Sequence, residues 1–295
     1  MDSPIQAHYS KIRRVLVIVL ILNWLVAAAK IIYGLITHCS SMTADGFHSL
    51  ADGTSNVIGL VGIHLAEQPR DSDHPYGHKK YETLFSLVIA ALLFVVAFNL
   101  AKEGLVRLHH PTMPTIDIAS FAIMLLTLSV NIAVMNYEHR KGKSLKSDIL
   151  ISDAMHTRAD ILTSLSVIAA LIFMKMGFAI LDPIVTMLIS LFIAYAGFSI
   201  LKESSNVLVD SAAILDTKRI EDICLSVKGV KACHKIRTRG RPDDIYVDLH
   251  VQVSGSMHVD NAHKICYAIE EAIKKGIPEV TDVVVHIEPN ENDGD

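Results

Sequence analysis

Two near-copies of one Asp/His pattern lie in separate apolar stretches of this chain. Residues 45–52 read D-G-F-H-S-L-A-D and residues 153–160 read D-A-M-H-T-R-A-D, so both follow D-x-x-H-x-x-x-D. On a helix, offsets of three and four place all three side chains on one face. An unpaired charge in hydrocarbon costs ~2.5–3.5 kcal/mol or more, so these groups need a function. Two such faces turned toward each other offer the carboxylate and imidazole ligands that divalent transition metals favour.

Coordination number separates the residues within each copy. Zn²⁺ prefers four ligands, and one His and one Asp from each helix supply that number: His48, Asp52, His156 and Asp160. Asp45 and Asp153 are expected toward opposite ends of the pocket, as outer-shell partners or entrance groups. Arg158 falls on the far side of its helix and should not reach the ion. The alternative, that these polar groups only bond helices together, does not explain why the pattern repeats.

Composition predicts membrane spans. Of the 295 residues, 51% are hydrophobic, and the mean hydropathy is +0.39, which soluble proteins of this size rarely reach. The net charge of −4 gives no reason to expect a nucleic-acid partner. The four cysteines have no C-x-x-C spacing, although Cys233 stands beside His234 and could touch a metal.

Apolar runs predict six membrane-spanning helices after a polar segment at 1–14. The predicted spans are 15–36, 41–66, 81–106, 116–137, 147–174 and 179–201. The first run is too long for the core of a cleaved signal peptide. Lys and Arg gather in the N-terminus and in predicted loops at 67–80 and 138–146, so both termini should face the cytoplasm.

The composition turns soluble after the last span. We place the six-helix transport domain at 15–203, a cytoplasmic αββαβ domain at 204–289 and a disordered tail at 290–295. The predicted elements of this domain are helices at 216–227 and 259–275 and strands at 230–238, 245–253 and 280–288.

Two further groups have the residue types of metal ligands. In the loop, Asp71, His74 and His78 are spaced by three and four residues, although a solvated turn would also explain them. In the soluble domain, imidazoles and one carboxylate fall on predicted strands and a helix, and together they could form a binuclear site: His234, His250, His263, His286 and Glu288. Asp248 shares a face with His250 and could orient it.

These motifs resemble the cation diffusion facilitator family. The resemblance rests on H-S-x-x-D in the second span, H-x-x-x-D in the fifth, the loop string D-S-D-H-P-Y-G-H-K-K-Y-E and the αββαβ tail, and it covers nearly the whole chain. It implies a homodimeric antiporter, not an enzyme, that exports Zn²⁺ from the cytoplasm in exchange for protons. It also implies a transport site on His48, Asp52, His156 and Asp160, metal sites in the loop and tail, and a salt bridge of Lys80 with Asp210 at the dimer. Some bacterial members have Asp where His48 stands, and the chain lacks a His-rich loop between spans four and five.

The proposed exchange follows from the ligands, since His must lose its proton and carboxylates must be ionised before a metal binds. The expected ion is Zn²⁺, both as substrate and as a structural or regulatory ion, with no organic cofactor. Fe²⁺, Mn²⁺, Co²⁺ and Cd²⁺ remain open, as does a metal-sensing scaffold without transport. An intramembrane metallohydrolase would show H-E-x-x-H, which is absent from the sequence. The absence of targeting segments suits the cytoplasmic membrane of a bacterium.

Overall fold

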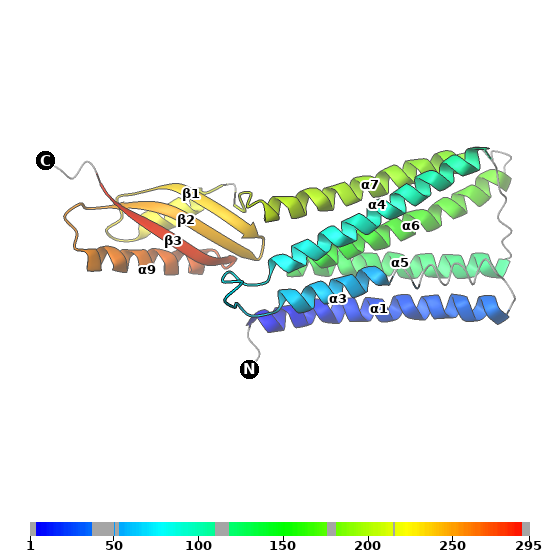
Figure 1. Ribbon diagram of the computed structural model, residues 1–295, viewed down its shortest axis with the longest axis horizontal. Coiled ribbons are helices and arrows are strands. Elements are labelled where there is room, and N and C mark those ends of the chain that lie inside the picture. The colour runs from blue at the N-terminus through cyan, green and yellow to red at the C-terminus, as the bar shows by residue number, and fades with distance from the viewer. Residues whose placement is uncertain are drawn as a thin grey trace. The chain divides into compact units, whose positions relative to one another are not determined.

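The computed structural model describes residues 4–36, 50, 53–109, 118–175, 181–214 and 216–290. The chain divides into two compact units, Met1–Ser204 and Ser205–Asp295. The first unit is helical, and the second combines a sheet with helices (Figure 1).

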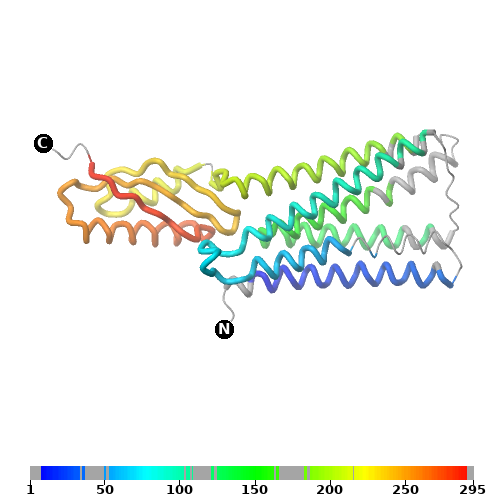
Figure 2. The backbone as a smooth tube through the Cα atoms, viewed as in Figure 1, coloured from blue at the N-terminus to red at the C-terminus, as the bar shows by residue number. Residues whose placement is uncertain are grey.

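Long helices lie side by side in the first unit and alternate in direction, as the backbone trace shows (Figure 2). Their bounds are α1 (Pro4–Ile36), α3 (Thr54–Ala66), α4 (Lys80–His109), α5 (Ile118–Leu145), α6 (Asp148–Lys175) and α7 (Leu181–Leu208). Among the described residues, three segments are long and apolar enough to cross a membrane: His8–Tyr33, Lys80–Val106 and Met187–Leu208. The helices α5 and α6 carry more charged and polar residues, whereas α3 is apolar but is described over only 13 residues.

Small residues let α3 approach its neighbours closely. A Cβ added at Gly62 would lie 2.7 Å from both Ile149 Cδ1 and Phe85 Cβ, and one at Gly59 would lie 2.9 Å from Ile149 Cγ2. Side chains larger than hydrogen would therefore push α3 away from α4 and α6. This close packing determines which groups of the neighbouring helices the polar side chains of α3 can reach.

The predicted loop at 138–146 is wrong, because α5 continues through Leu145. Arg and Lys are good helix formers, so the basic residues extend the helix. Lys146, with a φ of 49°, ends it, and the Ser147 N–H donates to Gly142 O at 3.0 Å. A single tight turn thus joins α5 to α6 and holds them antiparallel.

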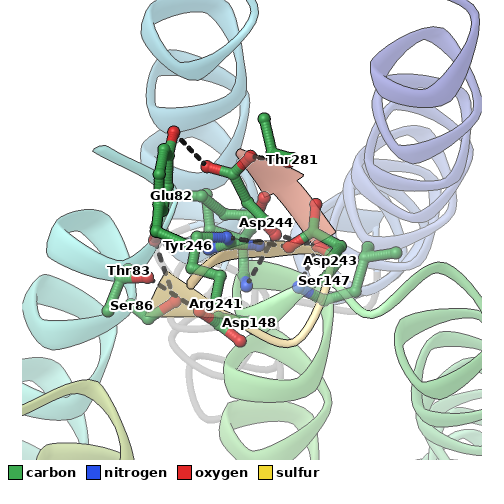
Figure 3. Close-up of polar contacts among 12 residues, drawn as sticks. Glu82, Thr83, Ser86, Ser147, Asp148, Arg241, Asp243, Asp244, Tyr246 and Thr281 are labelled. Atoms are coloured by element: carbon green, nitrogen blue, oxygen red, sulfur yellow. Dashed lines mark hydrogen bonds and ion pairs between the residues drawn. The ribbon is translucent and has the colours of Figure 1, made fainter. Parts of the chain in front are cut away.

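Two hydrogen bonds tie the start of α6 to the start of α4 (Figure 3). Ser147 Oγ donates to Glu82 Oε1, and Thr83 Oγ1 donates to Asp148 Oδ2 at 2.8 Å. Glu82 also accepts the Ile149 N–H at 3.5 Å. The carboxylate of Glu82 therefore serves the N-terminus of a neighbouring helix, where negative charge is favoured.

The second unit contains α8 (Lys218–Ser226), β1 (Ala232–Arg241), β2 (Asp244–Val253), α9 (Val259–Gly276) and β3 (Val280–Pro289). The sheet order is β1-β2-β3, with β1 antiparallel and β3 parallel to β2. Each predicted element is present within a few residues of its expected bounds. The fold class, a helical membrane domain followed by a small αββαβ domain, is confirmed.

One face of the sheet carries the core of this unit. Leu249 and Val251 of β2 pack in the same cluster as Ile265, Ile269 and Ile273 of α9, which repeat every four residues. Figure 1 shows α9 lying along the sheet. Since side chains alternate on a strand, residues between these apolar positions point to the opposite face. We call this opposite face the polar face.

A hairpin joins β1 to β2 through Pro242 and Asp243. Arg241 Nε donates to Asp243 Oδ1 at 3.1 Å, and Thr281 of β3 donates to Asp244 Oδ1 at 2.7 Å (Figure 3). Gly240, next to this turn, has a φ of 111°, and a Cβ there would lie 2.2 Å from Asp244 O. Glycine is therefore required by both backbone conformation and space.

Replacing Gly240 with Ala should destabilise the second unit by about 1–3 kcal/mol, because the residue must leave its left-handed conformation and displace the backbone of Asp244. Urea unfolding of residues 205–295 would measure this loss. Gly255→Ala is the matched control, since its Cβ would meet only Pro289 Cβ at 3.6 Å. Equal unfolding midpoints for the two variants would contradict the expected strain.

Candidate metal sites

The second Asp/His copy lies on α6, in the packed part of the helical unit. His156 is 5% exposed and Asp153 is fully buried, while Asp160 is half-buried and Arg158 is exposed. The face that carries Asp153 and His156 thus turns inward and Arg158 turns outward. Asp45, His48 and Asp52 lie outside the described residues, so only the second copy is placed in the fold.

Asp153 is held by residues that the sequence reasoning missed. Its Oδ2 accepts a hydrogen bond from Asn56 Nδ2 of α3, and Asn56 Oδ1 in turn accepts from Asn23 Nδ2 of α1 at 3.0 Å. One signal was available, since Asn56 follows Asp52 by four residues and so shares its helical face if the helix is continuous. The chain of hydrogen bonds links three helices through one carboxylate.

Glu138 of α5 is a further residue that the sequence does not single out, because its basic surroundings predict a loop. It is fully buried, and its Oε2 accepts from Thr157 Oγ1 of α6 at 3.1 Å. Thr157 is the residue directly after His156 and also contacts Asp153 O at 3.2 Å. Only the continuation of α5 beyond residue 137 places this carboxylate beside the Asp/His copy.

The loop between α3 and α4 brings together the three side chains predicted for it. Asp71 Oδ1 lies 3.1 Å from His74 Nδ1, and Asp71 Oδ2 lies 3.3 Å from His78 Nε2. A hydrogen bond from the His74 N–H, at 2.6 Å, is the main cause that lowers the pKa of Asp71 below its usual value. The carboxylate is therefore kept ionised, as a metal ligand must be. One ligand atom from each residue lies within 4.8 Å of the others, which a single ion could span.

A second cluster lies on the polar face of the sheet. Glu288 of β3 contacts His234 Nε2 through Oε2 at 3.0 Å and His250 Nδ1 through Oε1 at 2.6 Å. His286 Nε2 is 3.8 Å from Glu288 Oε1, and its ring centroid is 4.6 Å from that of His250. The hydrogen bond with His250 is the largest cause that lowers the pKa of Glu288. The cluster therefore consists of one carboxylate, that of Glu288, in contact with three imidazoles.

Strand register explains why these residues meet. His250 is opposite His234 on β1 and opposite His286 on β3, so three adjacent strands each contribute one imidazole. A bulge in β1 lies between His234 and Arg237, where Lys235 has a φ of 49°. The extra residue puts Arg237 on the same face as His234 although they are three apart. Cys233 points to the other face, where its thiol meets that of Cys224.

Four other predicted residues lie apart from the clusters. Asp248 Oδ2 forms an ion pair with Arg237 Nη2 at 3.5 Å. The interaction that the structure gives this carboxylate is therefore with an arginine and not with His250. His263 is on α9, with its ring 4.7 Å from that of Tyr267, and α9 covers the apolar face of the sheet. Lys80 begins α4 and Asp210 follows α7, in different units, so their pairing stays a prediction.

A helical membrane unit with buried carboxylate and imidazole groups, followed by a domain with its own cluster of such ligands, defines a membrane transporter of metal cations. Residues 16–209 match the cation efflux transmembrane domain, and residues 215–290 match the cytoplasmic domain of cation efflux proteins. The chain therefore belongs to the cation diffusion facilitator family, and divalent metal cations are its substrates.

Relatives match along almost the whole chain. An uncharacterized transporter of Methanocaldococcus jannaschii, MJ0449, is 30% identical over 94% of this chain and 98% of its own length. The manganese efflux system protein MneS of Bacillus subtilis is 28% identical over 84% of this chain and 86% of its own. MneP, another manganese efflux system protein of Bacillus subtilis, is 26% identical over 94% of this chain and 96% of its own length. The solved structure MamM-CTD 215-293 is 28% identical, with a TM-score of 0.24, and the match covers 25% of this chain and 94% of the solved chain.

The lowered pKa of Glu288 predicts how the metal-free second unit responds to acid. A carboxyl group whose pKa is lowered by folding stabilises the folded state at pH values above its ordinary pKa near 4.5. That stabilisation is lost as the pH falls through the pKa of the folded state. The urea midpoint of residues 205–295 should therefore drop between pH 5 and pH 3, and Glu288→Gln should reduce the drop. Glu270→Gln, a change in the same unit outside the cluster, should keep the drop of the unmodified domain. An unchanged drop in Glu288→Gln would contradict the prediction.

Proposed function

We propose that this protein exchanges a divalent metal cation for protons across the membrane through His48, Asp52, His156 and Asp160. The observation that carries the proposal is the hydrogen bond between Asn56 and Asp153. Asn56 comes one helical turn after Asp52, and Asp153 comes one turn before His156. If α3 continues backward as a helix, antiparallel packing brings the turn with Asp52 beside the turn with His156.

Proton coupling follows from the protonation needed for binding. The two imidazoles bind metal only when neutral, and the two carboxylates only when ionised. Metal and protons therefore compete for one set of atoms, and a site open to each side in turn exchanges one for the other. Because imidazoles titrate near neutral pH, protons compete with the metal for these atoms in the physiological pH range.

Zn²⁺ is the ion that we propose first, because two imidazoles and two carboxylates suit a borderline cation. Mn²⁺ is the second candidate, and the observation that favours it is the description of MneS and MneP as manganese efflux proteins. The direction of transport that we propose is outward from the cytoplasm, in keeping with the match to a cation efflux domain. Both termini would lie on the cytoplasmic side, as the distribution of Lys and Arg predicts. The host membrane that we propose is the cytoplasmic membrane of a bacterium.

We also propose that the protein is a homodimer whose C-terminal domains bind regulatory metal. His234, His250 and Glu288 would hold one ion, and His286 would contribute to a second. His263 can complete this binuclear site only from a second copy, because α9 covers the opposite face of its own sheet. Lys80 and Asp210 would pair at the same dimer, and Asp71, His74 and His78 would hold a further ion in the loop.

His156→Ala or Asp160→Ala should abolish metal-driven proton movement in proteoliposomes, because each removes one of four ligands. An internal pH dye would report transport of Zn²⁺, Mn²⁺, Cd²⁺ and Fe²⁺ under an imposed pH gradient. Arg158→Gln is the matched control on the same helix, since Arg158 is exposed on the other side. Transport that persists in both alanine variants would rule out this site, and the unmodified protein's preferred ion would decide between Zn²⁺ and Mn²⁺.

Zn²⁺ should shift residues 205–295 from monomer to dimer if His263 is supplied by a second copy. Sedimentation with and without Zn²⁺ would measure this, and Glu288→Gln should weaken the shift by about tenfold or more in Zn²⁺ concentration. His263→Ala should retain part of the metal binding but lose the dimer. Asp248→Asn, on the same face yet paired with Arg237, serves as the control. A Zn²⁺-induced dimer that survives His263→Ala would contradict the shared site.

A further inference from the structure

A buried lysine lies in the first membrane-spanning helix and has no role in the sites described so far. Lys30 of α1 is 7% exposed, and it is the one buried Lys or Arg among the described residues of the helical unit. It lies within the apolar segment His8–Tyr33. A charged side chain inside a membrane span is costly, and such groups typically face the interior of the bundle, pair with an opposite charge and mark the route of an ion.

The inward face of α1 shows which part of the bundle Lys30 faces. Buried and half-buried side chains follow one another on this helix at steps of three and four residues, at Tyr9, Ile12, Leu16, Val19, Asn23, Ala27 and Lys30. Asn23 on this face donates to Asn56 of α3, which in turn donates to Asp153 of α6. Because Lys30 follows Asn23 by seven residues, or two turns, it points to the same side of α1.

The same hydrogen bonds set the level of Lys30 along the bundle. The helices alternate in direction, so α1 and α6 run the same way (Figure 2). Lys30 comes seven residues after Asn23, and Asp160 comes seven residues after Asp153, which is a rise of about 10.5 Å on each helix. Lys30 and Asp160 therefore lie at the same depth, on the faces of α1 and α6 that turn toward the interior.

A packing contact at the other end of these helices gives the same level. A Cβ added at Gly59 of α3 would lie 2.9 Å from Ile149 Cγ2 and 3.3 Å from Leu16 Cδ1, so Leu16 and Ile149 are at one height. Counted from this pair, Lys30 is 14 residues along α1 and Asp160 is 11 residues along α6. The two estimates of depth agree to within one helical turn.

We propose that Lys30 is the internal counter-cation of the transport site: in the metal-free state its ammonium group pairs with the carboxylate of Asp160, and a metal ion must displace it. This step rests on the proposed function, in which Asp160 is a metal ligand. The ammonium group and the metal carry charge of the same sign, so they compete for this carboxylate. When the metal leaves, the ammonium group returns, and Asp160 is not left as an unpaired buried charge. Lys30 thereby weakens metal binding and favours release.

Metal affinity tests the proposal, because a lysine that competes with the metal and a lysine that only supports the fold have opposite effects. The background is the full-length chain with Asp71→Ala and Glu288→Ala, which disrupt the loop and tail clusters. In this background we expect Lys30→Met to bind Zn²⁺ and Mn²⁺ about tenfold or more tightly in equilibrium dialysis. Lys30→Arg keeps the charge and should keep the affinity. Lys102→Met, at an exposed lysine of α4, should leave the affinity unchanged. Unchanged or weaker binding by Lys30→Met would overturn the proposal.

Asp160→Asn in the same background separates this proposal from the proposed function. If Asp160→Asn loses binding while Lys30→Met binds no more tightly than the background chain, the role of Lys30 alone is overturned. If binding of both ions survives Asp160→Asn, the transport site is overturned, and the role of Lys30 at that site with it.

A second measurement needs no metal. In the metal-free background chain, Lys30→Met removes the counter-charge of Asp160 and should lower the midpoint of thermal unfolding in detergent. Adding Asp160→Asn to Lys30→Met removes the uncompensated charge and should recover part of that loss. A double variant whose shift equals the sum of the two single shifts would overturn the pairing.

Discussion

The hydrogen bond between Asn56 and Asp153 is the interaction on which the helical unit depends most. A buried carboxylate needs donors, and here an amide on a neighbouring helix supplies one. The need for this donor fixes the position of α3 along the axis of α6, and the glycines of α3 permit the two helices to approach closely. Asn56 also accepts a hydrogen bond from Asn23, which extends the network to α1. A group that is costly to bury thus determines how three helices align.

In the soluble unit the constraint comes from the sheet. Leu249 and Val251 must face the helices, so the residues that alternate with them along β2, Asp248 and His250, must face the other way. Hydrogen-bond register then sets His234 and His286 on either side of His250. Packing on one face therefore determines how the His/Glu cluster is arranged on the other, and no loop is needed to bring these side chains together.

Much of this fold follows from the sequence because the signals are periodic. Long apolar runs predicted the helices, and alternation with turn residues predicted the strands. The errors lie where charge and polarity mislead. The basic segment 138–146 is predicted as a loop, but a helix that leaves the apolar region can simply continue with Lys and Arg on its surface. Because this segment is predicted as a loop, Glu138 is not predicted to be buried beside α6. The bulge in β1 was also beyond prediction, because it depends on pairing with β2.

The candidate sites show the same division between local and tertiary information. Asp71, His74 and His78 are near in sequence, so their spacing alone indicated a cluster. His156 and Asp160 are predicted from their repeat, but the partners of Asp153 come from α3 and α5, which no local pattern reveals. His263 shows the limit most clearly: its residue type marks it as a ligand, yet the sheet separates it from the other ligands. In the proposed homodimer a second copy of the chain would remove that separation, and the ligands predicted from one sequence would then come from two molecules.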